Sequence, residues 1–136
     1  MATLGQVRDD LATRLSKIGG LGVWARIPDS IEPPVALVGM PEEGLFNVTY
    51  GPSYTAYTIP VRLYVSRFDA EVAQEALDEY VSPTGVMSVK RAIEDKTVAV
   101  TSDWLMVNVS KVSGFGSYSI ANVDYLGCEF TVEVIA

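Results

Sequence analysis

Residues 124–136 read DYLGCEFTVEVIA, and their side chains alternate in polarity along the stretch. The apolar side chains at every second position are Leu126, Cys128, Phe130, Val132 and Val134. The intervening positions include Glu129 and Glu133. Because successive side chains of an extended chain point to opposite faces, this pattern predicts a β-strand that is buried on one face. The predicted strand is about twice as long as the usual five or six residues. Its second face carries the two glutamates.

A second run with the same period spans residues 54–66, and its predicted inward side chains are Tyr57, Ile59, Val61, Leu63 and Val65. Pro60 lies inside this run. Proline cannot donate a hydrogen bond to a sheet, so Pro60 indicates an edge strand or a bulge. Shorter strands are predicted at 22–27, 35–39 and 104–113, and the stretch SGFGSYSIAN (113–122) is interpreted as a turn-rich connection.

The first element of the chain is predicted to be a helix over residues 4–18. Apolar residues recur there at spacings of three and four, which places them on one stripe. They are Leu4, Val7, Leu11, Leu15 and Ile18. Gly19 and Gly20 follow as a stop signal, because glycine tolerates the left-handed conformation that ends helices. Arg8, Asp9, Arg14 and Lys17 are then expected to face water.

Two further helices are predicted next to each other, over residues 69–81 and 86–95. The first has an acidic outer side that includes Glu75, Asp78 and Glu79, and the second has Val86, Val89 and Ile93 turned inward. Strands, two adjacent helices and more strands indicate an α+β fold. We expect one domain over residues 1–136. Its largely antiparallel sheet has the N-terminal helix and the two central helices packed on one face.

The segment MPEEGLFNVTYGPS (40–53) mixes acids, glycines and prolines with apolar residues. Long irregular loops in small domains are uncommon and often functional, so Phe46, Val48 and Tyr50 are candidates for a contact surface. Equally, LFNVTY could form one strand of a hairpin, with its side chains packed on the monomer's own core. The pattern does not choose between the two interpretations.

Composition restricts the classes of function. The formal charge is −7 over 136 residues, which disfavours duplex DNA binding by a single copy. The chain contains no histidine, which excludes imidazole-based triads and the commonest transition-metal ligand. Cys128 is the single cysteine and is interpreted as a packing residue. We expect no membrane span and synthesis in the cytoplasm.

A search for catalytic chemistry yields weak signals. Glu42 and Glu43 lack the alternating oxygen ligands of a calcium loop, and Gly114 and Gly116 form a GxG without the rest of a phosphate-binding motif. The acids on the helix at 69–81 are interpreted as a solvated face. We therefore predict no catalytic residue and no metal site.

Four stretches together cover most of the chain: IGGLGVW (18–24), PDSIEPPVALVG (28–39), the block from YTIPVRLYVS to KRAIE (57–94), and VSGFGSYSIANVDYLGCEFTVEV (112–134). In their order and periodicity they resemble the tail-terminator, or tail-completion, proteins of long-tailed bacteriophages, most of all those of phages that infect actinobacteria. The resemblance rests on apolar periodicity and turn residues, and not on a catalytic motif. Related neck and connector proteins share the α+β plan.

The resemblance implies a non-enzymatic structural protein of the virion without a cofactor. Such a protein forms a hexameric ring on the last ring of the tail tube, ends tube growth and meets the head-completion protein at the head-tail junction. Genomic DNA passes through the ring without specific binding. In such a ring Glu129 and Glu133 could line the channel, or they could simply solvate an outer sheet face.

For the subunit or partner interface, the candidates are Phe46, Val48 and Tyr50 on the loop, and Pro60 on the predicted edge strand. The alternative functions are a head-completion or connector protein of the neck and, from a different class, a small ligand-binding or catalytic α+β domain.

Overall fold

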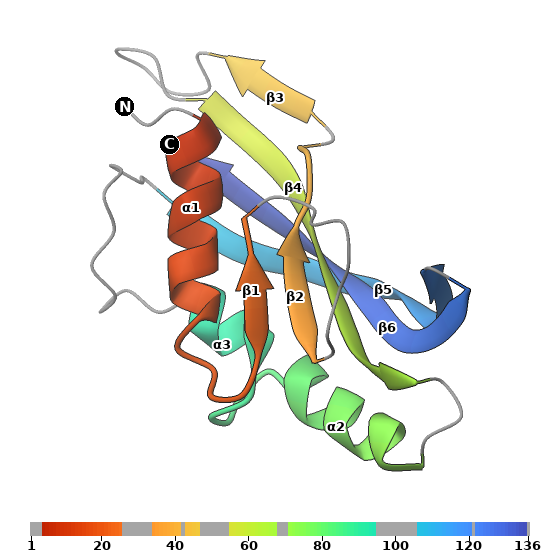
Figure 1. The fold of residues 1–136 in the computed structure, drawn as a ribbon. Helices are drawn as coiled ribbons and strands as arrows, with labels where there is room; N and C mark the ends of the chain where they lie inside the picture. The colour runs from red at the N-terminus through yellow and green to blue at the C-terminus, as the bar shows by residue number, and fades with distance from the viewer. Residues whose placement is uncertain are drawn as a thin grey trace.

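The computed structural model describes residues 4–25, 34–41, 43–46, 55–67, 71–94, 106–120 and 122–135. The elements, in chain order, are α1 (Leu4–Leu15), β1 (Gly22–Trp24), β2 (Val35–Val38), β3 (Glu43–Phe46), β4 (Thr55–Arg67), α2 (Glu71–Val81), α3 (Val89–Glu94), β5 (Met106–Ile120) and β6 (Val123–Ile135). Figure 1 shows the long strands β4, β6 and β5 running side by side, with α1 beside them and α2 and α3 near one end.

The strands form one sheet with the order β1-β2-β4-β6-β5, and β3 pairs with β4 outside this path. The pairing is antiparallel except between β1 and β2, which are parallel. This arrangement confirms the predicted α+β class with a largely antiparallel sheet, an N-terminal helix and two later helices.

Strand β6 lies between the two other long strands and is paired with both. Phe130 is opposite Val61 of β4 and Val112 of β5. The apolar side chains of β6 that were predicted to share one face are all buried: Leu126, Cys128, Phe130, Val132 and Val134. The inward residues Ile59, Val61 and Leu63 of β4 are fully buried beside them. The alternation in both strands is therefore confirmed.

The inference that Pro60 marks an edge or a bulge is wrong. Pro60 is buried and lies opposite Thr131 of β6, within a strand that has partners on both sides. On its other side the Gly39 N–H donates to the Pro60 carbonyl over 2.8 Å. The N–H and C=O of one strand residue point to the same side, so the donor that proline lacks would face Gly39. The missing donor thus falls between the stretch of β4 that pairs with β2, which ends at Val38, and the stretch that pairs with β3.

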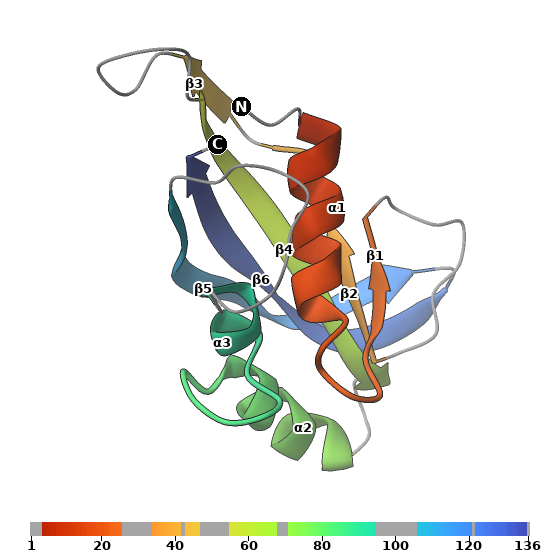
Figure 2. The same ribbon diagram turned by 90° about the vertical axis from the view of Figure 1, so that its left-hand side faces the viewer.

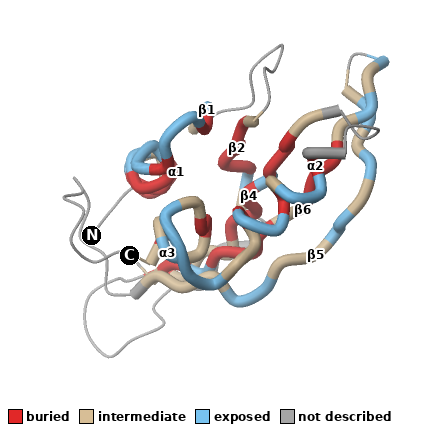
Figure 3. The backbone as a smooth tube through the Cα atoms, turned by 90° about the horizontal axis from the view of Figure 1, so that it is seen from below, coloured by how far each residue is buried: buried red, intermediate tan, exposed pale blue. Residues whose placement is uncertain are grey.

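The main core combines side chains of the sheet with side chains of all three helices. From α1 it contains Val7, Leu11 and Leu15, all fully buried, and Ile18 follows just after the helix. Residues Ala73, Leu77, Tyr80, Val89 and Ile93 of α2 and α3 join the inward residues of β4 and β6 in this core. In Figure 3 α1 is buried on one side and exposed on the other, as the predicted stripe requires.

Some helix boundaries differ from the predictions. Helix α1 ends at Leu15 and is followed by turns up to Gly20. Gly20 has a left-handed φ of 79°, so the predicted glycine signal ends these turns and not the helix itself. Helix α3 begins at Val89, and Val86 is 78% exposed instead of inward-facing. Figure 2 shows α1 and α3 in front of the sheet and α2 at its lower end. That all three helices pack on one face stays a prediction.

Two arginines of α1 that were expected to face water are buried instead. Arg8 donates through Nη2 to the Val38 carbonyl over 3.1 Å, and Arg14 donates through Nη1 to the Ile93 carbonyl over 2.6 Å. Each arginine reaches a carbonyl at the end of another element. Because a guanidinium is rarely buried without such partners, these bonds allow α1 to dock closely against β2 and α3.

The segment 113–122 is not a loop connection. Strand β5 continues to Ile120 and pairs with β6 up to Ile120 opposite Val123, and Asn122 takes a left-handed φ of 65° in the turn. The glycines of this segment lie at an irregularity of the register between Ser113 and Gly116. The glycines therefore belong to a bulge inside a strand and not to a turn between two strands.

Replacing Arg14 by alanine removes a charged hydrogen bond to a buried carbonyl. We expect Arg14→Ala to lower the free energy of unfolding by about 2 kcal/mol. Lys17→Ala, on an exposed residue after the same helix, should change it by less than about 0.5 kcal/mol. Urea denaturation of both variants measures the difference, and equal small losses would contradict the buried role of Arg14.

Candidate interaction surfaces

The sheet has a second face, here called the outer face, formed by the side chains that alternate with those of the main core. On β4 and β6 it includes Arg62, Tyr64, Glu129 and Glu133. Trp24 of β1 lies opposite Leu37 of β2 and is 50% exposed on the same face. This surface follows from the period-two pattern of the strands. A partner that binds to this side of the sheet would contact these side chains.

One end of the outer face is not open to solvent but forms a second, small core. Its buried members are Val35, Leu37 and Tyr64, and partly buried Tyr118, Ile120 and Tyr125 pack against them. The rings of Tyr64 and Tyr118 meet edge to face, with their centroids 5.5 Å apart and their planes at 77°. Figure 1 shows the end of the β5–β6 hairpin bending away from the direction of the rest of the two strands. The curled hairpin thus brings the three residues of its tip onto the outer face.

Glycines and register irregularities make this curl possible. The registers slip between Tyr64 and Ser66 on β4 and between Ser113 and Gly116 on β5. Bulges of this kind bend strands and increase their twist. Gly114 and Gly116 have φ values of 68° and 152°, which disfavour other residues. The Tyr118 hydroxyl donates to the Gly114 carbonyl over 2.5 Å and closes the bend.

Gly127 of β6 lies very close to the backbone of Leu63 and to the rings of Tyr64 and Tyr118. A Cβ there would clash with the Leu63 carbonyl and lie 3.1 Å from Tyr64 Cδ1 and 3.3 Å from Tyr118 Cδ2. The two tyrosine rings therefore lie in the space that a side chain at position 127 would occupy. This requirement explains a glycine within an otherwise β-prone run, where it would normally weaken the strand.

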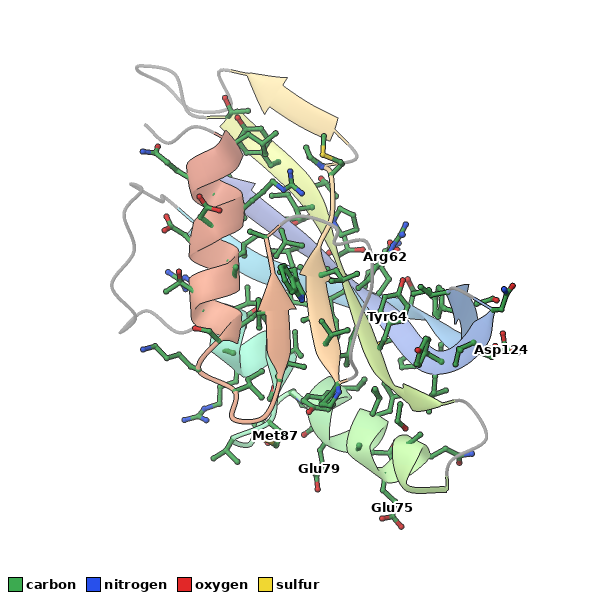
Figure 4. All side chains as sticks on the ribbon, in the orientation of Figure 1. Arg62, Tyr64, Glu75, Glu79, Met87 and Asp124 are labelled. Atoms are coloured by element: carbon green, nitrogen blue, oxygen red, sulfur yellow. The ribbon has the colours of Figure 1, made fainter. Side chains whose placement is uncertain are left out.

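The two glutamates proposed for a channel lining both lie on the outer face but in different settings. Glu129 lies opposite Arg62, whose Nε is 3.3 Å from Glu129 Oε2. Figure 4 places Arg62 beside Tyr64 on β4. Glu133, four residues further along β6, is exposed. The charge of Glu129 is thus partly offset by Arg62, and Glu133 is the more open of the two.

Burial raises the pKa of the Tyr118 hydroxyl, and the nearby charge of Glu129 raises it further. Burial also raises the pKa of the Cys128 thiol to about 12. A thiol with this pKa is neutral near pH 7 and a poor nucleophile, which agrees with the interpretation of Cys128 as a packing residue. In the part of the chain that the structure describes, no three acidic or cysteine side chains come together as a possible metal site.

The predicted loop interface is only partly described. Phe46 belongs to β3, where it lies opposite Thr55 of β4, so the backbone of residues 43–46 follows the hairpin interpretation. The side chain of Phe46, and Val48 and Tyr50 entirely, lie outside the described residues. Pro60 is buried in the middle of the sheet, so the argument that placed an interface there through an edge strand no longer applies.

The acidic side of α2 agrees with its prediction as a solvated face. Glu75, Asp78 and Glu79 are exposed. Figure 4 shows Glu75 and Glu79 pointing away from the body of the molecule.

Sequence reasoning missed Phe115, which is 56% exposed at the β5 bulge. Its place between two glycines was the available signal, because a bulge turns side chains out of the regular alternation.

A scan against models of known protein families finds no match, and a search of curated proteins finds no significant similarity. Among the described residues, no helix is both long enough and apolar enough to cross a bilayer.

Substitution of Gly127 tests the close approach at the bend. We expect Gly127→Ala to lower the free energy of unfolding by about 2 kcal/mol, because the added methyl group meets backbone as well as the tyrosine rings. The matched control is Gly19→Ala, since a Cβ at Gly19 has no neighbour within 4 Å. Its effect should stay below about 0.5 kcal/mol. Urea denaturation of both variants measures this, and equal stabilities would contradict the tight packing over Gly127.

Proposed function

We propose that this chain is a structural protein of a phage virion, the tail terminator. Six copies form a ring that caps the tail tube, ends its polymerisation and joins the tail to the head-completion protein of the neck. The ring stands at the head-tail junction, and genomic DNA passes through it without specific binding. The chain has no catalytic role in this proposal and uses no cofactor.

The observation that carries the proposal is the order and type of the elements. An N-terminal amphipathic helix, a largely antiparallel sheet and two later helices are the plan that the sequence resemblance implies. The outer face adds support, because it combines an open apolar side chain, Trp24, with the exposed acid Glu133. A sheet face of mixed character suits contact with neighbouring subunits on some positions and exposure to a channel on others.

Tube assembly with purified proteins tests this function. When the chain is added to tail-tube protein that is polymerising, we expect tubes of arrested length, each with a ring of six subunits at one end in electron micrographs. A variant with serine at Phe46, Val48 and Tyr50 should reduce capping if the predicted loop interface is used. Tubes that keep growing at the same rate, with bare ends, would refute the role.

The channel hypothesis predicts an effect of charge reversal on the outer face. Like charge opposes adhesion of DNA, so the Glu129→Lys/Glu133→Lys double variant should slow genome ejection from assembled virions. Glu133→Lys alone should slow ejection as well, and it leaves the Arg62–Glu129 pair intact. Glu79→Lys changes the net charge as much as Glu133→Lys does but lies on α2, so it should leave ejection unchanged. Normal ejection by the double variant would refute the channel position of these glutamates.

A further inference from the structure

Strand β5 is an edge strand of unusual length. It spans 15 residues and pairs with β6 on one side, and no described strand pairs with its other side. An unpaired strand edge is a template for another chain, and proteins protect such edges with charges, prolines and bulges. The sequence of β5 contains no proline and a single charged residue, Lys111. Two register irregularities, after Val109 and after Ser113, interrupt it.

A carboxylate from α3 reaches this edge. Glu94 Oε2 accepts a hydrogen bond from the Val109 backbone N–H over 2.9 Å, and Glu94 Oε1 accepts one from Lys90 Nζ. Val109 lies opposite Val132 of β6, yet its N–H is used by the side chain of Glu94. The N–H therefore points away from β6, toward the free edge of the sheet.

The position of Glu94 is determined by the core. Val89 and Ile93 of the same short helix are fully buried, and their packing holds the last turn of α3 against β5. Figure 2 shows α3 directly in front of β5. Partial burial raises the pKa of Glu94, but the hydrogen bonds from Lys90 and Val109 and the charge of Lys90 outweigh it and lower the pKa. An ionised carboxylate is a stronger acceptor than the carbonyl of an incoming strand.

A second copy of the chain is the partner that fits this edge best. The other edges that the structure describes, β1 and β3, have three and four residues, so only another β5 matches its length. Two copies with a net charge of −7 repel each other least along a strand that contains no acid. Antiparallel pairing of β5 with itself would join the copies about a twofold axis.

We propose that Glu94 is an edge cap that keeps β5 from pairing with the β5 strand of a second copy. The carboxylate occupies the Val109 N–H that such a ladder would use, and Lys90 holds it there. This inference is independent of the proposed function. In a ring, however, neighbours meet head to tail, so a twofold β5 pair would compete with ring assembly and the cap would prevent it.

Removal of the acceptor tests the cap. Glu94→Met keeps a side chain of similar length and good helix propensity but offers no oxygen to Val109. We expect the variant to show a concentration-dependent doubling of mass, relative to the wild type, in light scattering after gel filtration. Exchange of the Val109 amide in the dilute variant should be at least about tenfold faster than in the wild type, because an exposed amide opens at little cost.

Two further variants separate the cap from general effects. Glu94→Met/Val109→Pro lacks the edge donor as well and should return to the mass of the wild type, since proline is tolerated at strand edges and cannot join a ladder. Glu79→Ala removes one negative charge from an exposed position on α2 and should not associate. If Glu94→Met does not fold by circular dichroism, Glu94→Ala replaces it with the same expectation.

Unchanged mass and unchanged Val109 exchange in the folded Glu94 variant would overturn the proposal. Equal association of the Glu94 and Glu79 variants would overturn it too, because loss of charge alone would then explain the result. Failure of tube capping by the wild type would refute the proposed function but would leave this test unaffected.

Discussion

The structure depends on the position of β6 between β4 and β5. Its register places Phe130 opposite Val61 on one side and Val112 on the other, and turns its apolar side chains into the main core. A slip of one residue would move Phe130 to the outer face and bring Glu129 into the core. Burying an unpaired carboxylate costs several kcal/mol. The total free energy of unfolding of a small domain is of similar size, so such a slip would not be tolerated. The register is therefore strongly specified.

The outer face follows from the same register. Once the apolar residues of β6 point into the main core, Gly127, Glu129 and Glu133 face the other way, and Gly127 leaves space for the rings of Tyr64 and Tyr118. The hairpin can then curl over Val35 and Leu37 and form a second core. The remaining outer face, with Arg62, Glu129 and Glu133, is partly or fully exposed. The surface that the proposed function needs is thus a consequence of how the main core is filled.

The regular elements could be predicted because their signals are local. Alternation identified β4 and β6, and spacing of three and four identified the buried stripe of α1. The burial of Arg8 and Arg14 could not be predicted in this way, because their partner carbonyls lie 30 and 79 residues away along the chain. Local sequence shows the charge of an arginine but not a distant carbonyl that can receive its hydrogen bond.

Pro60 and the segment 113–122 show two further limits of local patterns. A proline is excluded from a central strand only if its missing donor interrupts a strand ladder, and here the missing donor falls opposite Gly39, between the ladders of β2 and β3. The glycines and serines of 113–122 favoured a turn, although Tyr118 and Ile120 alternate with serines in the manner of a strand. For the candidate site, the sequence identified Glu129 and Glu133 as sharing one face. It did not indicate the Arg62 partner or the edge contact of Glu94, because both depend on the strand order.

Native-state hydrogen exchange along β6 and β5 tests the central position of β6 most directly. With partners on both sides, β6 amides from Leu126 to Val134 should exchange only through global unfolding and share one high free energy of opening. The β5 amides that point to the free edge should exchange through small local openings. Exchange of β6 as fast as that of the β5 edge would contradict the strand order, and with it the outer face described above.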